Sequence, residues 1–343
     1  MNRVRYEISK LETVDALNIA RKLNELQVEE AFDFYANMKW VRPFGMLLAS
    51  SAIKSFRNKY PEISFKMDFN DGKSGLDYAG HMGFFKAISD KIDFGKMPGG
   101  AKGNDNYIPI TELDLSEIHK KEIENGNFVE MGDAVEKESA RLAKILSRNN
   151  EELHKLLTYL IREILRNIPE HSDSCKAFVC GQYWSDETAE IAILDEGIGI
   201  LNSLQKNQTH RKYIENDEEA IEYAIKAGIS KAFQPSKTNK SEEVWSNSGF
   251  GLFMVSEICK ELNGSFCLAS GSKYIILYRD GSLRIGDTAF KGTAIKIAIS
   301  TNDVLDSSDL ISRIADRGAE QAKTIRNAFK TASVPSKGLI SSL

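Results

Sequence analysis

The feature that most limits how this 343-residue chain can fold is an apolar stripe between Leu153 and Ile168. Aliphatic residues recur there at the three- and four-residue spacing of one helix face. They are Leu156, Leu157, Leu160, Ile161, Ile164, Leu165 and Ile168. The pattern predicts a strongly amphipathic helix. Pro169 removes a backbone donor from its last turn, so we expect the helix to end or kink near His171.

The segments after this helix predict the rest of an α/β domain. Short runs of apolar and β-branched residues predict strands at Lys176–Trp184, Glu190–Asp195, Ser265–Ala269, Tyr274–Tyr278 and Thr293–Ile299. Helical spacing recurs at Glu218–Lys226 and Phe250–Leu262. We therefore assign residues 149–300 to one domain, and residues 301–343 to a helical C-terminal tail with one helix, Asp309–Phe329.

The N-terminal part alternates between the same two periodicities. Helical patterns occupy Asp15–Leu26, Phe44–Lys59 and Tyr78–Ile88, and strand patterns occupy Ala31–Tyr35 and Ile63–Phe69. This alternation predicts a small α/β domain over residues 1–105, closed by a loop or linker at 95–104 that is rich in glycine. A strand at Tyr107–Ile118 and a charged helix at Met131–Ser147 connect the two domains through residues 106–148.

Composition limits the kinds of partner and the cellular compartment that we expect for this chain. The net charge of −4 argues against a general nucleic-acid-binding surface, although it allows a local basic groove. No stretch approaches the roughly 18 apolar residues of a membrane span, and the N-terminus has no apolar signal core. The cysteines have no zinc spacing and are expected to be reduced core thiols: Cys175, Cys180, Cys259 and Cys267. We expect a soluble cytoplasmic protein.

Three polar residues share one side of the amphipathic helix. Glu163, Asn167 and His171 lie four residues apart, a spacing that drifts little around an α-helix. Magnesium takes hard oxygen ligands and borrows others from substrate phosphates, which suits a carboxamide beside a carboxylate. The carboxylate can also orient or deprotonate an attacking water. The alternative for this motif alone is a solvated polar helix face.

Two glycine-containing motifs follow. Asp195-Glu196-Gly197-Ile198-Gly199 comes directly after a strand, where a carboxylate can accept a hydrogen bond from an amino group such as that of adenine. Its glycines let the backbone approach a flat base or a phosphate. Ser248-Gly249-Phe250-Gly251-Leu252 opens a helix whose free N–H groups suit a phosphate. An ordinary turn and a flexible helix entry are the alternatives.

Gly292-Thr293 opens the last strand, where the Thr293 hydroxyl can support Asp195 directly or through water. The dipeptide carries little information by itself. The order of the four motifs along the chain, each on the element that its chemistry needs, makes the combination informative.

Together these residues resemble the GHKL ATPase superfamily of gyrase, heat-shock chaperone, histidine kinase and mismatch-repair ATPases. Glu163, Asn167 and His171 match its N box. The glycine boxes and the threonine are matched by Asp195, Gly197, Gly199, Gly249, Gly251 and Thr293. The resemblance implies a Bergerat fold, a mixed sheet covered on one face by helices, which binds ATP and Mg²⁺. It further implies that Asn167 holds magnesium, Asp195 binds adenine and Glu163 is the catalytic base.

The resemblance also implies an ATP lid between the glycine boxes. Its lysines Lys231, Lys237 and Lys240 are candidates to contact the γ-phosphate, and Lys237 is our preferred one. Within the superfamily, the pair His171-Ser172 is most similar to the small anti-sigma-factor kinases.

The N-terminal residues 32–69 resemble a STAS domain, the fold of anti-sigma-factor antagonists. The similarity lies in Phe32-Asp33-Phe34, in the turn Arg42-Pro43-Phe44-Gly45 and in the helix that follows it. Antagonists carry a phosphorylatable serine just before this helix, where this chain has Pro43 and Phe44. The turn is therefore expected to serve docking or dimerisation rather than phosphorylation.

Three functions follow from these residues. The leading one is a slow ATPase that acts as a nucleotide-driven conformational switch. The second is a kinase for serine, threonine or histidine of a partner, although the nearest phosphoacceptor candidate, His154, lies on the N-box helix itself. The third is a non-enzymatic module whose interactions depend on ATP. A protein partner and a homodimer are expected from the resemblance alone.

Overall fold

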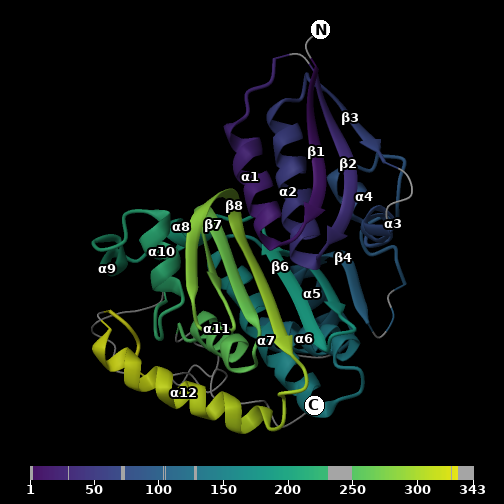
Figure 1. Cartoon of the computed structure of the whole chain (residues 1–343). Coiled ribbons are helices and arrows are strands. Elements are labelled where there is room, and N and C mark those ends of the chain that lie inside the picture. The colour runs from purple at the N-terminus through teal and green to yellow at the C-terminus, as the bar shows by residue number, and fades with distance from the viewer. Residues whose placement is uncertain are drawn as a thin grey trace.

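The computed structural model describes residues 3–29, 31–70, 74–102, 104, 106–126, 130–230, 249–325 and 327–330. A unit built on a small sheet lies above a larger sheet that is backed by helices, with α12 running below them (Figure 1). The N-terminal elements are β1 (Arg3–Leu11), α1 (Thr13–Glu25), β2 (Ala31–Val41), α2 (Pro43–Lys59), β3 (Ser64–Phe69), α3 (Ser74–His81) and α4 (Phe84–Ile88).

The second part of the chain contains the larger sheet and most of the helices. Its first elements are β4 (Tyr107–Asp114), α5 (Leu115–Glu124), α6 (Met131–Leu146), α7 (Glu151–His171), β5 (Lys176–Tyr183) and β6 (Thr188–Asp195). They are followed by α8 (Gly199–Gln205), α9 (Gln208–Arg211), α10 (Asp217–Ala224), α11 (Gly251–Glu261), β7 (Ser265–Leu277), β8 (Leu283–Ser300) and α12 (Ser307–Thr324).

The small sheet is parallel and has the order β1-β2-β3. Parallel neighbours need a crossover connection, and α1 and α2 provide one after each of the first two strands. Strand β1 was not predicted from the sequence, although Val4, Tyr6 and Ile8 alternate with charged residues there as a strand requires. The α/β character predicted for this region is confirmed.

The large sheet has the order β4-β5-β6-β8-β7, and all its ladders among the described residues are antiparallel. The mixed sheet expected from the resemblance is therefore wrong for these strands. The physical reason is that β5 and β6 are joined by a tight turn, as are β7 and β8, and a short connection reverses the chain. The strands predicted at 265–269 and 274–278 are one strand, β7, with register shifts beside Gly271. Strand β8 begins ten residues before Thr293, at Leu283.

Both faces of the large sheet are buried, because successive side chains of a strand point to opposite faces. In β6, Ile191 and Ile193 belong to the core that also contains residues of α7 and α11. Ala192 and Leu194 belong instead to the core formed with the N-terminal elements. The helices expected on one face are present, and the N-terminal unit covers the other.

Helix α2 is in contact with both sheets. Its residues are buried nearly all round the helix, as expected for a helix enclosed on every side. A Cβ atom at Gly45 would lie 1.7 Å from the carbonyl oxygen of Leu11, so only glycine permits this approach to β1. At the start of α2, Glu190 of β6 accepts a hydrogen bond from the Phe44 N–H at 3.5 Å and pairs with Arg42 at 3.5 Å. The turn Arg42-Pro43-Phe44-Gly45 is thus docked on the large sheet of the same chain.

Several predicted boundaries change. The helix expected at 78–88 is divided into α3 and α4 at Gly83, whose φ is +90°. The strand expected at 107–118 ends at Asp114, whose side chain caps α5. Helix α12 ends at Thr324 rather than at residue 329, and α8 and α9 were not predicted. Within the described ranges, no helix is both long enough and apolar enough to cross a membrane.

Candidate functional site

Glu163, Asn167 and His171 are carried by α7. Asn150 caps this helix by accepting a hydrogen bond from the Leu153 N–H at 2.9 Å. The helix continues through Pro169 and ends at His171. Glu163, Asn167 and His171 therefore lie on one continuous helix, as predicted.

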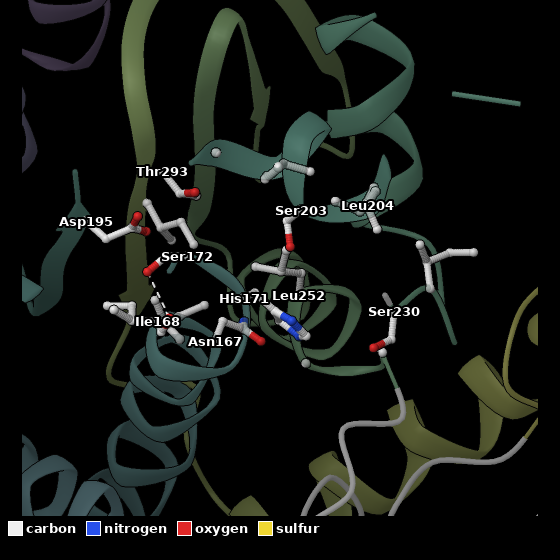
Figure 2. A pocket seen from close by; sticks show the side chains of 18 of the residues that line it. Asn167, Ile168, His171, Ser172, Asp195, Ser203, Leu204, Ser230, Leu252 and Thr293 are labelled. Carbon is white, nitrogen blue, oxygen red and sulfur yellow. Dashed lines mark hydrogen bonds between the residues drawn. The ribbon is translucent and has the colours of Figure 1, made fainter. Parts of the chain in front are cut away.

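A pocket lies between the C-terminal half of α7, the end of β6, the middle of β8, helix α8 and the start of α11. Residues predicted for the nucleotide site from four separate segments line it: Asn167, His171, Asp195, Gly199, Gly249, Gly251 and Thr293. Figure 2 shows Asp195 and Thr293 together on one side, Asn167 and His171 along the lower edge, and Ser230 across the pocket. Much of the remaining wall is aliphatic, with Ile164, Ile168, Ile193, Ile200, Leu204, Leu252 and Ile295.

Asp195 is a buried carboxylate at the end of β6. Its Oδ1 accepts a hydrogen bond from the Gly197 N–H at 2.9 Å, and its side chain is hydrogen-bonded to Thr293, its cross-strand partner on β8. Burial raises the pKa of Asp195 to about 6, against the lowering effect of these hydrogen bonds. A buried carboxylate on an apolar wall is an acceptor available for a polar hydrogen of a bound ligand.

The first glycine box is held against the end of α7. The Ile198 N–H donates to the carbonyl oxygen of Ser172 at 2.9 Å, and a Cβ atom at Gly197 would lie 2.2 Å from that oxygen. Gly197 is thus placed behind the pocket wall rather than in it. Its role is to let the loop after Asp195 approach α7 closely.

Gly199 begins α8 with a φ of +76°, a conformation that favours glycine. Ser270 of β7 fixes this turn. Its hydroxyl accepts a hydrogen bond from the Ile200 N–H at 3.0 Å and donates to the carbonyl oxygen of Gly292 at 2.7 Å. One side chain therefore links the first glycine box to the residue before Thr293.

Glu163 lies beneath the first residue of α11. A Cβ atom at Gly251 would lie 2.8 Å from Glu163 Oε2, so a side chain there would displace this carboxylate oxygen. The other carboxylate oxygen, Oε1, accepts a hydrogen bond from the buried Arg162 guanidinium at 3.0 Å. Arg162 also lies 3.7 Å from the Glu136 carboxylate of α6. Glu163 is buried beside the pocket, at the start of the helix expected to contact phosphate.

A backbone hydrogen bond connects Gly249 with Gly228, which precedes the predicted lid. The Gly228 N–H donates to the carbonyl oxygen of Gly249 at 3.1 Å, which brings the two ends of the intervening segment together. Phe329, after α12, donates its N–H to the carbonyl oxygen of Gly228 at 2.8 Å. The lysines predicted to contact the γ-phosphate, Lys231, Lys237 and Lys240, lie outside the described residues, as does Ser248.

Sequence reasoning missed two residues that shape the site. Ser270 carries no motif of its own, and only its pairing with Thr293 across β7 and β8 brings it to the glycine box. Arg162 offered a signal, because it is a basic residue on a helix whose neighbours are largely apolar. Over the part of the chain that the structure describes, no cluster of three or more His, Cys, Asp or Glu side chains is arranged to hold a metal ion.

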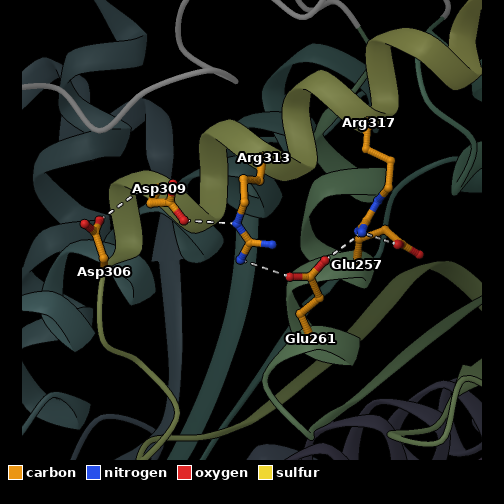
Figure 3. Close-up of polar contacts among 6 residues, drawn as sticks. All are labelled: Glu257, Glu261, Asp306, Asp309, Arg313 and Arg317. Carbon is orange, nitrogen blue, oxygen red and sulfur yellow. Dashed lines mark hydrogen bonds and ion pairs between the residues drawn. The ribbon is translucent and has the colours of Figure 1, made fainter.

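Helix α12 joins the two helices that border the pocket. At its start, Glu152 of α7 accepts hydrogen bonds from the Ser307 N–H at 2.9 Å and the Ser307 hydroxyl at 2.6 Å. The ion pair with Lys155 and these bonds lower the pKa of Glu152 to about 2. Further along, Arg317 contacts Glu261 at 2.7 Å and Glu257 at 2.8 Å, both on α11 (Figure 3).

Reversing the charge of Arg317 tests this connection. The Arg317→Glu variant places a third carboxylate beside Glu257 and Glu261, and we expect it to lower the free energy of unfolding by about 1 kcal/mol in urea titrations. Adding Glu257→Arg to the same chain should recover most of that loss. Lys323→Glu is the matched control, because Lys323 pairs only with Glu320 of its own helix in the described ion pairs. Equal losses in Arg317→Glu and Lys323→Glu would contradict a specific link to α11.

Neither a scan against models of known protein families nor a search of curated proteins found a match for this chain.

Proposed function

We propose that this chain binds Mg-ATP in the pocket between α7, β6 and the start of α11, and hydrolyses it slowly as a GHKL-type nucleotide switch. The observation that carries the proposal is the set of seven predicted residues around one pocket, drawn from α7, the end of β6 and start of α8, the start of α11, and β8. Asp195 and Asn167 are separated in sequence but line the same cavity. A pocket with an apolar wall and a few converging polar groups is the common form of a small-molecule site.

The base-binding half of the proposal rests on Asp195. Its carboxylate is fixed by Gly197 and Thr293 and lies among aliphatic side chains that suit a flat purine. An exocyclic amino group would donate a hydrogen bond to it, which offsets the cost of keeping a charge in a buried site. This combination favours adenine over a base with a carbonyl at that position.

The phosphate-binding half rests on α11 and Asn167. The first N–H groups of a helix have no partner within it and favour anions, and Gly249 and Gly251 leave this helix start accessible from the pocket. Asn167 offers a carboxamide oxygen in the same pocket, which fits a magnesium ion that takes few protein ligands and several from phosphates and water. Magnesium would neutralise phosphate charge there.

Glu163 is the proposed general base. It lies one helical turn before Asn167, and its Oε2 faces the start of α11. We propose that this carboxylate orients a water for attack on the terminal phosphorus, while the bond to the bridging oxygen breaks and ADP leaves. The proton removed from that water would pass to this carboxylate.

The surrounding architecture supports the assignment. Strands β5, β6, β8 and β7 carry α7 and α11 on one face, as expected for a Bergerat-type nucleotide domain, although their ladders are antiparallel and not mixed. The β1-α1-β2-α2-β3 order with a parallel sheet is similar to a STAS-like unit. We propose that the two form one switch, with α2 packed on the sheet that carries Asp195.

Calorimetric titration tests the proposal on the full chain. We expect Mg-ATP to bind with a measurable heat at millimolar nucleotide, and chelation of magnesium to weaken ATP binding about tenfold. In Asn167→Ala, magnesium should make little further difference to ATP affinity, because its protein ligand is gone. Asn24→Ala, an exposed asparagine on α1, is the control and should behave as wild type. Absence of any heat with Mg-ATP in the folded wild-type protein would refute the proposed function.

A further inference from the structure

A larger cavity lies away from the proposed nucleotide pocket, where the N-terminal unit meets the β4 edge of the large sheet. It has a volume of about 770 Å³ and is bordered by α2, β3, α4, the segment after α4, and strands β4 and β5. We call it the basic groove, because four cationic residues line it: Lys54, Arg57, Lys86 and Lys91. Small-molecule sites commonly occur at such junctions, with volumes of roughly 300–1,000 Å³.

Two of the cations of the basic groove are held by backbone carbonyl oxygens, which do not neutralise their charge. Arg57 donates to the carbonyl oxygen of Ile88 at 3.1 Å, and Lys86 donates to the carbonyl oxygen of Asp90 at 2.9 Å. Both acceptors are uncharged. In the ion pairs made by the described residues, none of the four cations takes part.

The acidic residues of the groove do not balance this charge. Glu112 is already paired with Lys176 at 2.6 Å, and Asp90 is exposed at the rim. The local excess of positive charge contrasts with the net charge of −4 of the whole chain. Like charges that converge in one concavity repel each other, and a bound anion would relieve that repulsion.

Apolar and aromatic side chains line the rest of the groove. Lys54 lies over the Phe178 ring at 5.8 Å and Arg57 over the Phe65 ring at 5.8 Å. Ile88 and Ile110 are buried in its wall, and Met97 is exposed beside them. The groove therefore offers cations and an apolar surface to the same ligand.

We propose that the basic groove binds a small amphipathic anion, in which a carboxylate, sulfonate or phosphate head is joined to an apolar or aromatic body. The head would lie toward the cations of α2 and α4, and the body along Ile110 and Phe178 of the large sheet. A polynucleotide fits less well, because its phosphates repeat along an open track, whereas this groove has an apolar wall. The inference does not depend on ATP binding at the other site.

A matched pair of fluorescent probes tests this inference on the full chain. The anionic probe 8-anilinonaphthalene-1-sulfonate and the uncharged N-phenyl-1-naphthylamine share one aromatic body and differ in the sulfonate. We expect the anionic probe to bind wild type with a higher affinity than the uncharged one. The double variant Lys54→Glu/Lys86→Glu should weaken binding of the anionic probe about tenfold and leave that of the uncharged probe within about twofold.

The controls separate this site from a general charge effect. Lys120→Glu on α5 makes the same type of charge change on an exposed lysine away from the groove, and should leave both probes unaffected. Lys91→Glu gives a second, exposed test in the groove, with a loss of about threefold. Anionic-probe binding that is absent from wild type, or that is equal in wild type and the Lys54→Glu/Lys86→Glu variant with native circular dichroism, would overturn the proposal.

Discussion

Replacing Asp195 with asparagine is expected to remove measurable Mg-ATP binding and, at the same time, to make the folded protein more stable at pH 8. The carboxylate is the proposed acceptor for the adenine amino group, and the substitution replaces one of its oxygens by a donor. We expect the Kd to rise at least about a hundredfold, since a mismatched buried donor pair costs several kcal/mol. Isothermal titration calorimetry with Mg-ATP measures this loss.

The gain in stability follows from the pKa of Asp195. Burial raises this pKa from its ordinary value of 3.8 to about 6 in the folded chain. The stability that Asp195 contributes through its protonated form is therefore complete below pH 3.8, and is lost as the pH rises through about 6. Asparagine stays neutral, so Asp195→Asn should exceed wild type by on the order of 2 kcal/mol at pH 8 and by little at pH 4.

The same titration predicts how binding depends on pH. Protonation of Asp195 removes the proposed acceptor, so the affinity of wild type for Mg-ATP should fall as the pH is lowered through about 6.

Glu196→Gln is the matched control for Asp195→Asn, because Glu196 is the next residue, is exposed, and accepts a hydrogen bond from Ser51 instead of lining the pocket. If Asp195→Asn binds Mg-ATP as wild type does, the proposed role of Asp195 is wrong.

Replacing Glu163 with glutamine should separate binding from chemistry. We expect release of phosphate from ATP to fall by roughly 10²–10⁴-fold, the usual contribution of a positioned base, while the Kd for Mg-ATP stays within about threefold. Glutamine is chosen over alanine because its amide oxygen can still accept the bond from the buried Arg162. Single-turnover phosphate release and calorimetry on the same preparation give the two values.

Two further measurements make this test decisive. Glu151→Gln, at the exposed start of the same helix, should hydrolyse ATP at the wild-type rate. Incubation with γ-labelled ATP shows whether phosphate reaches water or protein. Label on this chain or on an added partner would favour the kinase alternative. Unchanged hydrolysis by Glu163→Gln would exclude this residue as the base under either function.

The local elements that carry the site were predictable because their signals are short-range. The apolar stripe that begins at Leu153 predicted α7, and the four-residue spacing of Glu163, Asn167 and His171 placed them on one side of it. The hairpin formed by β5 and β6 follows from two apolar runs and a polar turn. In each case, residues within two or three turns of each other contain the information.

From the sequence by itself we predicted seven of the residues that line the candidate pocket, because their motifs have recognisable local patterns, but not that Gly197 lies behind the wall or that Thr293 lies within β8. Only the tertiary structure decided how the strands pair within each sheet and which elements cover the two faces of the large sheet. Residues distant in sequence make the contacts that fix these features. Examples are the antiparallel strand order, the packing of α2 on the sheet, the hydrogen bond from α2 to Glu190, and the two hydrogen bonds of Ser270. Such contacts depend on how complete elements pack together, and no periodicity within a single element encodes that choice.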